Sequence, residues 1–150
     1  MRNKIAIAIT AAALVTTLTS CSGAGVNAPT RMINQVTDGV EANVKSEGNL
    51  IYLRNIHVTV NEAGDANLVG TIVNQNPTED ALLALAINKM QIKLSAIPVL
   101  QNKPVIFGGE SANAIATIPT AGLTAGKRIP VSFFFGLGGT VTVDALVVNA

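Results

Sequence analysis

Short runs of apolar and β-branched residues dominate the chain from residue 50 onward. The runs are Leu50–Val60, Leu68–Asn74, Gln91–Ala96, Val105–Phe107, Asn113–Ile118, Ile129–Phe135 and Thr140–Val148. Clusters of Gly, Pro, Asn and Asp separate them, and these are the residues that tight turns favour. Strands of this length and spacing predict an all-β domain, either an antiparallel sandwich or a barrel.

The last two runs flank only a glycine-rich turn, Gly136–Gly139, so we predict that they pair as an antiparallel hairpin. Side chains alternate between the two faces of a strand. Phe133 and Phe135 therefore share one face of this hairpin, and Phe134 lies on the other.

Two segments do not follow the strand pattern. Glu79–Met90 consists of helix-forming residues, but its length and its position between strands leave both helix and strand open. Residues 31–49 are polar with scattered Val and Ile, and we predict no element there.

The N-terminal residues have the pattern of an export signal. Arg2 and Lys4 precede an uncharged apolar run of 14 residues, Ile5–Leu18. A membrane-spanning helix needs roughly 20 apolar residues, so this run is typical of a signal peptide. The run ends in Leu18–Cys21 (LTSC), which resembles the lipobox of bacterial lipoprotein precursors.

The lipobox resemblance implies that the thiol of Cys21 takes a diacylglyceryl group and that signal peptidase cuts after Ser20. Two acyl chains are enough for stable anchoring. The alternative is an ordinary secretory signal cut within residues 22–24, which would leave a soluble protein. Cys21 is the only cysteine of the chain and stands where a lipobox requires it, so we expect a lipid anchor on the extracytoplasmic side of the cell membrane.

The predicted organisation is a signal peptide (1–20), a lipidated flexible tether (21–30) and a β-sandwich domain (31–150). Without Arg2 and Lys4, the 10 basic residues fall to 8, against 9 acidic ones. There is no basic patch, and we expect no nucleic-acid partner. With Cys21 acylated no thiol remains for a disulfide, so stability must come from packing.

The sequence does not predict an enzyme. General acid–base chemistry needs titratable groups within hydrogen-bond reach of each other, and the acidic residues here are scattered over predicted turns. No Gly-x-Ser-x-Gly nucleophile motif is present. The glycines of Gly136–Gly139 precede a strand and not a helix, so they form a turn and not a phosphate-binding loop.

Several short stretches of the chain carry a family resemblance. They are Val69–Asn74, Asp80–Leu83, Phe107–Gly109, Gly122–Phe133 and Gly138–Val143. These stretches resemble the periplasmic copper chaperones (PCuAC) that deliver Cu(I) for assembly of the copper-A centre, together with their actinobacterial envelope lipoprotein relatives. Leu53–Ile56 also resembles the lipoprotein branch. The resemblance implies a Greek-key, cupredoxin-like antiparallel β-sandwich with Phe133 and Phe135 inside it.

The copper ligands of that family do not carry over to this sequence. In the chaperones a His-x-Met pair follows the double glycine, whereas here Ser111 and Asn113 stand at those two positions. Upstream, the chain has Leu94 and Ser95 where the family has another His. Cu(I) prefers soft sulfur and imidazole ligands over oxygen. We therefore expect no metal at the usual place.

The remaining soft ligands of the mature chain are His57, Met32 and Met90, and no two of them have ligand spacing. A lone His within an apolar strand is typically structural, and Met90 after an aliphatic run is typical of a core residue. The sequence therefore predicts a non-catalytic binding or interaction module whose partner is an envelope protein or a small ligand. The alternative is a Cu(I) metallochaperone that uses these non-standard His and Met ligands.

The lipid anchor can be tested directly. Replacing the thiol in Cys21→Ser removes the acylation site, so the variant is expected to accumulate as an uncleaved precursor. Labelling with a radioactive fatty acid, followed by gel analysis, measures both properties. Normal lipid incorporation by the variant would contradict the prediction.

Overall fold

The computed structural model describes residues 39–46 and 49–150. The predicted signal peptide and tether, with Cys21 and Met32, lie outside the described residues. No helix in the described ranges is long and apolar enough to cross a membrane.

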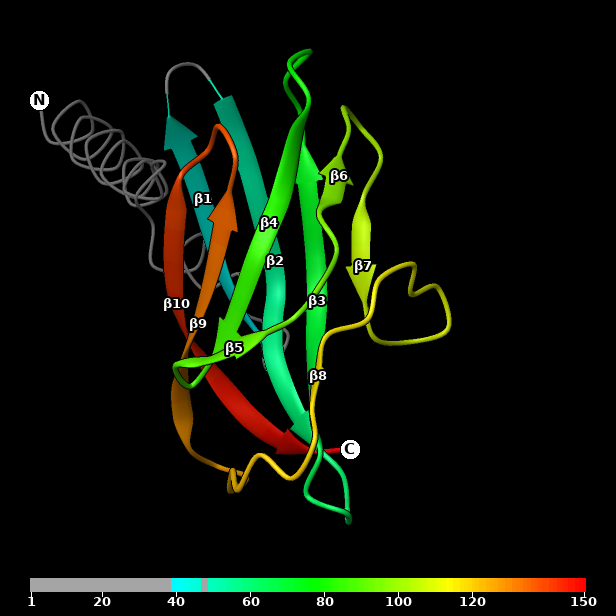
Figure 1. The fold of residues 1–150 in the computed structure, drawn as a ribbon, viewed down its shortest axis with the longest axis vertical. Helices are drawn as coiled ribbons and strands as arrows, with labels where there is room; N and C mark the ends of the chain where they lie inside the picture. The colour runs from blue at the N-terminus through cyan, green and yellow to red at the C-terminus, as the bar shows by residue number, and fades with distance from the viewer. Residues whose placement is uncertain (1–38, 47–48) are drawn as a thin grey trace, which may run out of the picture. The chain divides into compact units, whose positions relative to one another are not determined.

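The described residues form ten strands and no helix (Figure 1). The strands are β1 Val40–Ser46, β2 Asn49–Val60, β3 Ala66–Asn74, β4 Asp80–Ile87, β5 Met90–Ile92, β6 Ile97–Val99, β7 Val105–Phe107, β8 Thr117–Ile118, β9 Arg128–Phe135 and β10 Thr140–Asn149. The predicted all-β, cupredoxin-like sandwich is confirmed.

The strands pair in the order β5-β4-β9-β10-β2-β3-β7, with β6 on β4, β1 on β2 and β8 on β3. One layer contains β4, β5, β6 and β9, and the other contains β1, β2, β3, β7 and β8. β10 joins the layers because it pairs antiparallel with β9 and parallel with β2. The sequence predicted only antiparallel pairing. The parallel pair of β10 and β2 was not predicted, because pairing between strands far apart in the chain leaves no local signal.

The core lies between the layers and is almost entirely aliphatic. Along β3 every second residue is buried, and β2 and β4 contribute fully buried Ile and Leu side chains. Phe133 and Phe135 are 0% and 5% exposed, and their rings stack with centroids 6.4 Å apart. Phe134 is 36% exposed on the outer face. The predicted hairpin and its register are therefore confirmed.

The structure shows which elements form in the two segments that did not follow the strand pattern. Glu79–Met90 contains strand β4, because pairing with β9 on one edge and with β5 and β6 on the other overrides its helix propensity. Strand β1 lies in the segment for which no element was predicted, and its partner is β2.

Two predicted strands are shorter than expected. The run Gln91–Ala96 is a strand only as far as Ile92, because Ile92 is the last of its residues to pair with β4 and to be buried. The run Asn113–Ile118 is a strand only at its last two residues, because residues 113–116 belong to a loop.

A β-bulge interrupts the long strand β2. Asn55 has a φ of 53°, and the pairing with β3 shifts register between Arg54 and His57. Gly70 lies opposite the bulge, where a Cβ would be 2.5 Å from Cδ1 of Ile56 and 3.1 Å from the backbone oxygen of Arg54. Only glycine fits there. Before the bulge β2 pairs with β1, and beyond it with β10.

A buried carboxylate fastens the start of β4 to the β9–β10 turn. Asp80 is 7% exposed. Its Oδ1 accepts hydrogen bonds from the backbone N–H groups of Ala81 and Leu137, at 2.7 and 2.9 Å, and Oδ2 accepts one from Gly138 at 2.7 Å. The turn's backbone is thus satisfied by a side chain from a distant strand.

The burial of the three phenylalanines predicts their contributions to stability. Phe133→Ala is expected to lower the free energy of unfolding by about 3–5 kcal/mol, because it leaves a cavity in the core. Phe134→Ala is expected to cost clearly less, since its ring already contacts water. Urea unfolding of each variant measures the difference. If Phe134→Ala were the more damaging, the inward face of β9 would be the opposite one.

Candidate binding site at the Gly108–Ala116 loop

The segment that follows β7 leaves the edge of β3 and then returns to it. β7 pairs with β3 at residues 70–72, and β8 pairs with it at residues 66–67. Between them the chain makes an outward loop, residues 108–116, which begins at Gly108 and Gly109 with φ of 74° and 80°. The loop lies at the side of the sandwich (Figure 1).

Asn113 closes this loop onto β7. Its Oδ1 accepts a hydrogen bond from the backbone N–H of Ile106 at 2.7 Å, and its Nδ2 donates to the backbone oxygen of Pro104 at 2.9 Å. The backbone N–H groups of Asn113 and Ala114 both donate to the oxygen of Ile106. These bonds satisfy the outer edge of β7, which would otherwise carry unpaired backbone groups.

A shallow hollow of about 210 Å³ lies between the loop and β3. Its lining residues are Asn67, Leu68, Gly108, Ala112, Ala114, Ile115 and Ala116. The lining is mostly apolar, and the side-chain oxygen of Asn67 already accepts a 2.6 Å hydrogen bond from the Thr117 hydroxyl. Ile115 is 82% exposed. This arrangement can offer apolar contact but no reactive group.

The predicted soft-ligand candidates do not come together. His57 lies between the buried Ile56 and Val58 on β2, so it faces outward from its layer, and its Nδ1 is 3.0 Å from the backbone oxygen of Asn55. Met90 lies on β5, in the other layer. In the part of the chain that the structure describes, no group of three or more His, Cys, Asp or Glu residues is placed to hold a metal ion.

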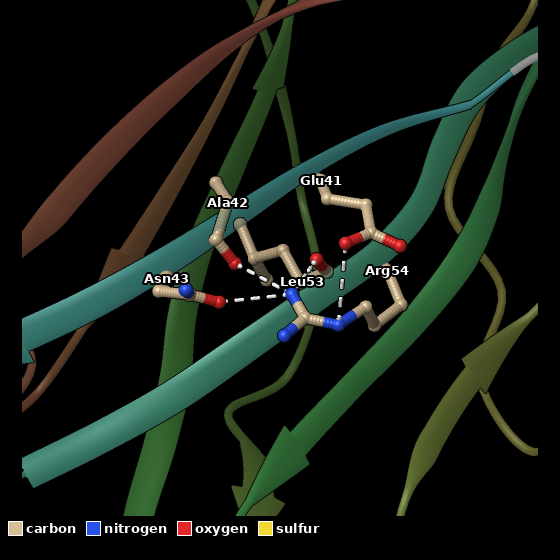
Figure 2. A network of polar contacts seen from close by, with 5 residues as sticks. All are labelled: Glu41, Ala42, Asn43, Leu53 and Arg54. Carbon is tan, nitrogen blue, oxygen red and sulfur yellow. Dashed lines mark hydrogen bonds and ion pairs between the residues drawn. The ribbon is translucent and has the colours of Figure 1, made fainter. Parts of the chain in front are cut away.

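Arg54 ties β1 to β2 (Figure 2). Its Nη1 donates to the backbone oxygens of Ala42 and Leu53 and to Oδ1 of Asn43, and its Nε is 3.7 Å from the carboxylate of Glu41. The guanidinium also lies 4.6 Å from the ring centre of Tyr52. These contacts give the residue a structural role.

The hydrogen bonds between the backbone and the side chains of Asp80 and Asn113 were not predicted from the sequence. Asn and Asp in turns commonly bond to backbone, and that composition signal was present. Their actual partners could not be read from it, because Leu137 and Gly138 are far from Asp80 along the chain.

Solved structures similar to this chain include three PCuAC domains. The apo PCuAC domain from PmoF1 is 15% identical, has a TM-score of 0.60, and aligns over 74% of this chain and 100% of its own. The copper-bound PCuAC domain from PmoF2 is 17% identical, with a TM-score of 0.55 over 74% and 99%. The apo PmoF2 PCuAC domain is 14% identical, with a TM-score of 0.54 over 72% and 95%.

The described domain has the PCuAC fold. At 14–17% identity the similarity shows the fold of the backbone, and it assigns no role to the side chains of the loop. No protein-family model matches the chain, and no curated protein sequence matches it.

Of the residues singled out from the sequence, Ser111 and Asn113 lie in this loop, and Leu94 and Ser95 lie between β5 and β6. Ser111 is exposed at the tip of the loop, and Asn113 is bonded to the backbone on both sides of its amide. Leu94 is half-buried and Ser95 is exposed. The loop is thus held by hydrogen bonds within the chain.

The side-chain hydrogen bonds of Asn113 predict a difference in stability between variants at two positions of this loop. Asn113→Ala removes the partner of the Ile106 N–H and of the Pro104 oxygen. Because these bonds are exposed to water, the loss is expected to be about 0.5–1.5 kcal/mol of unfolding free energy. Ser111→Ala, at an exposed position of the same loop for which no side-chain hydrogen bond is seen within the described residues, is the matched control and is expected to be nearly neutral. Urea denaturation compares them. Equal effects would contradict a structural role for Asn113.

Proposed function

We propose that this chain is a lipid-anchored, non-catalytic binding module of the bacterial envelope that does not use the copper loop of its fold. The observation that carries the proposal is the pair of hydrogen bonds made by the Asn113 side chain. Its amide is hydrogen-bonded to the backbone of Pro104 and Ile106 at 2.9 and 2.7 Å. To bind a ligand, this side chain would have to leave the edge of β7 unpaired.

The chemistry of the loop supports the same proposal. The side chains at the two ligand positions end in a hydroxyl and an amide, and Cu(I) favours thioether and imidazole ligands. The hollow beside them is lined mostly by apolar atoms, and Ile115 is 82% exposed. Exposed apolar side chains next to a hollow are typical of contact with a partner.

The polar groups of the described residues support a non-catalytic role. The buried carboxylate of Asp80 already accepts three backbone N–H groups. The Nδ1 of His57 is bonded to a backbone oxygen. General acid–base catalysis needs a titratable group within reach of a second group and of a substrate, and neither residue has that arrangement.

The lipid anchor fits a module that meets its partner at the membrane. Cys21 lies 18 residues before Gly39, where the described domain begins. A chain of that length spans at most about 60 Å. A lipid on Cys21 would therefore keep the domain within reach of envelope proteins and lipids, without fixing which face meets them.

A copper metallochaperone with non-standard ligands is the second candidate. One structure of similar fold is the copper-bound PCuAC domain from PmoF2. In this chain, the bond between Nδ1 of His57 and a backbone oxygen leaves Nε2 available, which is the usual arrangement of a metal-binding His. The partner ligand in this candidate is a methionine. Met90 lies in the other layer from His57, which leaves Met32.

Anaerobic Cu(I) titration against a chromophoric chelator separates the two candidates. A copper-binding PCuAC domain is the positive control. We expect the full chain to show no tight stoichiometric binding, since its loop lacks soft ligands. Tight binding that is lost in His57→Ala would contradict the proposal and support the metallochaperone. Met32→Leu, which removes a thioether but keeps the volume, then tests the second ligand, and Met90→Leu in the other layer is its matched control.

A further inference from the structure

A second hollow, of about 280 Å³, lies on the outer face of the layer that contains β4, β5 and β9. Its lining residues are Ala84, Ala86, Lys89, Gln91 and Phe134. Strand register explains its shape, because Ala84 pairs with Phe134 and Ala86 pairs with Gln91. Two small side chains thus form the floor of a groove, the phenyl ring forms one wall, and longer polar side chains form the other.

One end of this alanine-floored groove is apolar. Phe134 is 36% exposed, which is unusual for a large aromatic side chain on an open sheet face. Beside it, the β4–β9 register shifts between Leu82 and Ala84, and Leu83 stands out from the sheet with 52% of its surface exposed. The bulge therefore adds a second exposed apolar side chain near the phenyl wall.

The other end carries a cation held in a strained backbone. Asn88 and Lys89 form the two-residue β4–β5 turn, with φ of 49° and 67°. Turns with two positive φ values favour Gly at the second position, because a Cβ is strained there. Strained residues of this kind cluster at functional sites. In the described ranges, the Lys89 ammonium has no ion-pair partner.

The floor of the groove offers no free strand edge to a peptide; such pairing is possible only at the outer edge of β5, beside the groove. β4 is paired with β9 on one edge and with β5 and β6 on the other, and β9 is paired with β4 and β10. An extended peptide bound by strand addition needs an open sheet edge. An acyl chain carries no backbone polar groups, so it needs no such partners.

We propose that this groove binds a single-chain anionic amphiphile, a fatty acid, with its carboxylate on Lys89 and its chain over Ala86 and Ala84 against Phe134. From Ala84 to the end of β4 at Ile87 the floor runs about 10 Å, at about 3.3 Å per residue, and the turn with Lys89 follows. The inference deepens the proposed function and rests on it, because it gives the non-catalytic module a ligand class.

Calorimetric titration of the full chain with sodium dodecanoate, below its micelle concentration, tests the proposal. Acetate supplies the carboxylate without the chain, and dodecyltrimethylammonium supplies the chain with the opposite charge. We expect saturable one-to-one binding of dodecanoate and at least tenfold weaker binding of the other two. Absence of saturable dodecanoate binding, or equal binding of the cationic amphiphile, would overturn the proposal.

Four variants assign the binding to the groove. Lys89→Gly removes the ammonium and also relieves the turn, so its melting temperature is expected to be unchanged or higher while dodecanoate affinity falls at least tenfold. Phe134→Ala is expected to weaken binding similarly, and Lys89→Arg to retain it. Lys93→Ala, an exposed lysine outside the lining, is the matched control and is expected to bind like the parent.

Unchanged dodecanoate affinity in both Lys89→Gly and Phe134→Ala would place the ligand elsewhere and overturn the assignment. The Cu(I) titration does not depend on these results. A failed fatty-acid titration together with absent Cu(I) binding would therefore reject the ligand class and leave the proposed non-copper module standing.

Discussion

The β-bulge at Asn55 in β2 is the constraint on which the rest of the fold depends. It turns the strand so that its first half pairs with β1 and its last residues pair with β10. Because β10 also pairs with β9, this change of partner connects the two layers that enclose the core. The bulge exists only because Gly70 lets the backbone of β3 approach it closely. His57, two residues further on, bonds to the carbonyl of Asn55 and so belongs to the same local structure.

Polar side chains provide hydrogen-bond partners for the backbone N–H and C=O groups of turns and strand edges. Asp80 does this for the β9–β10 turn and Asn113 for the edge of β7. The buried Asn74 donates to the backbone oxygens of Thr78 and Val99 and accepts from the Asn76 N–H. Each of these groups would be costly to bury without partners. At the loop of residues 108–116, the hydrogen bonds of Asn113 fasten the chain to β7.

The two hollows lie on different layers and differ in chemistry. The hollow beside residues 108–116 is mostly apolar, and its amide oxygen is already bonded. The alanine-floored groove has an apolar end and a cationic end. Lys89 has a positive φ in its turn, and Phe134 exposes part of its ring on an open face. The packing of the sandwich requires neither feature. This contrast makes the groove the stronger candidate for a specific ligand, and the loop the stronger candidate for contact with a protein.

The sequence by itself determined whatever depends on near neighbours. The period-two runs predicted most of the strands, the turn at Gly136–Gly139 predicted the last hairpin, and alternation separated Phe134 from its two neighbours. Only the tertiary structure decided that Asp80–Ile87 is a strand, that β10 lies parallel to β2, and that Lys89 and Phe134 border one groove. These features depend on pairing between segments far apart in the chain, which outweighs local propensity and leaves no periodic signal.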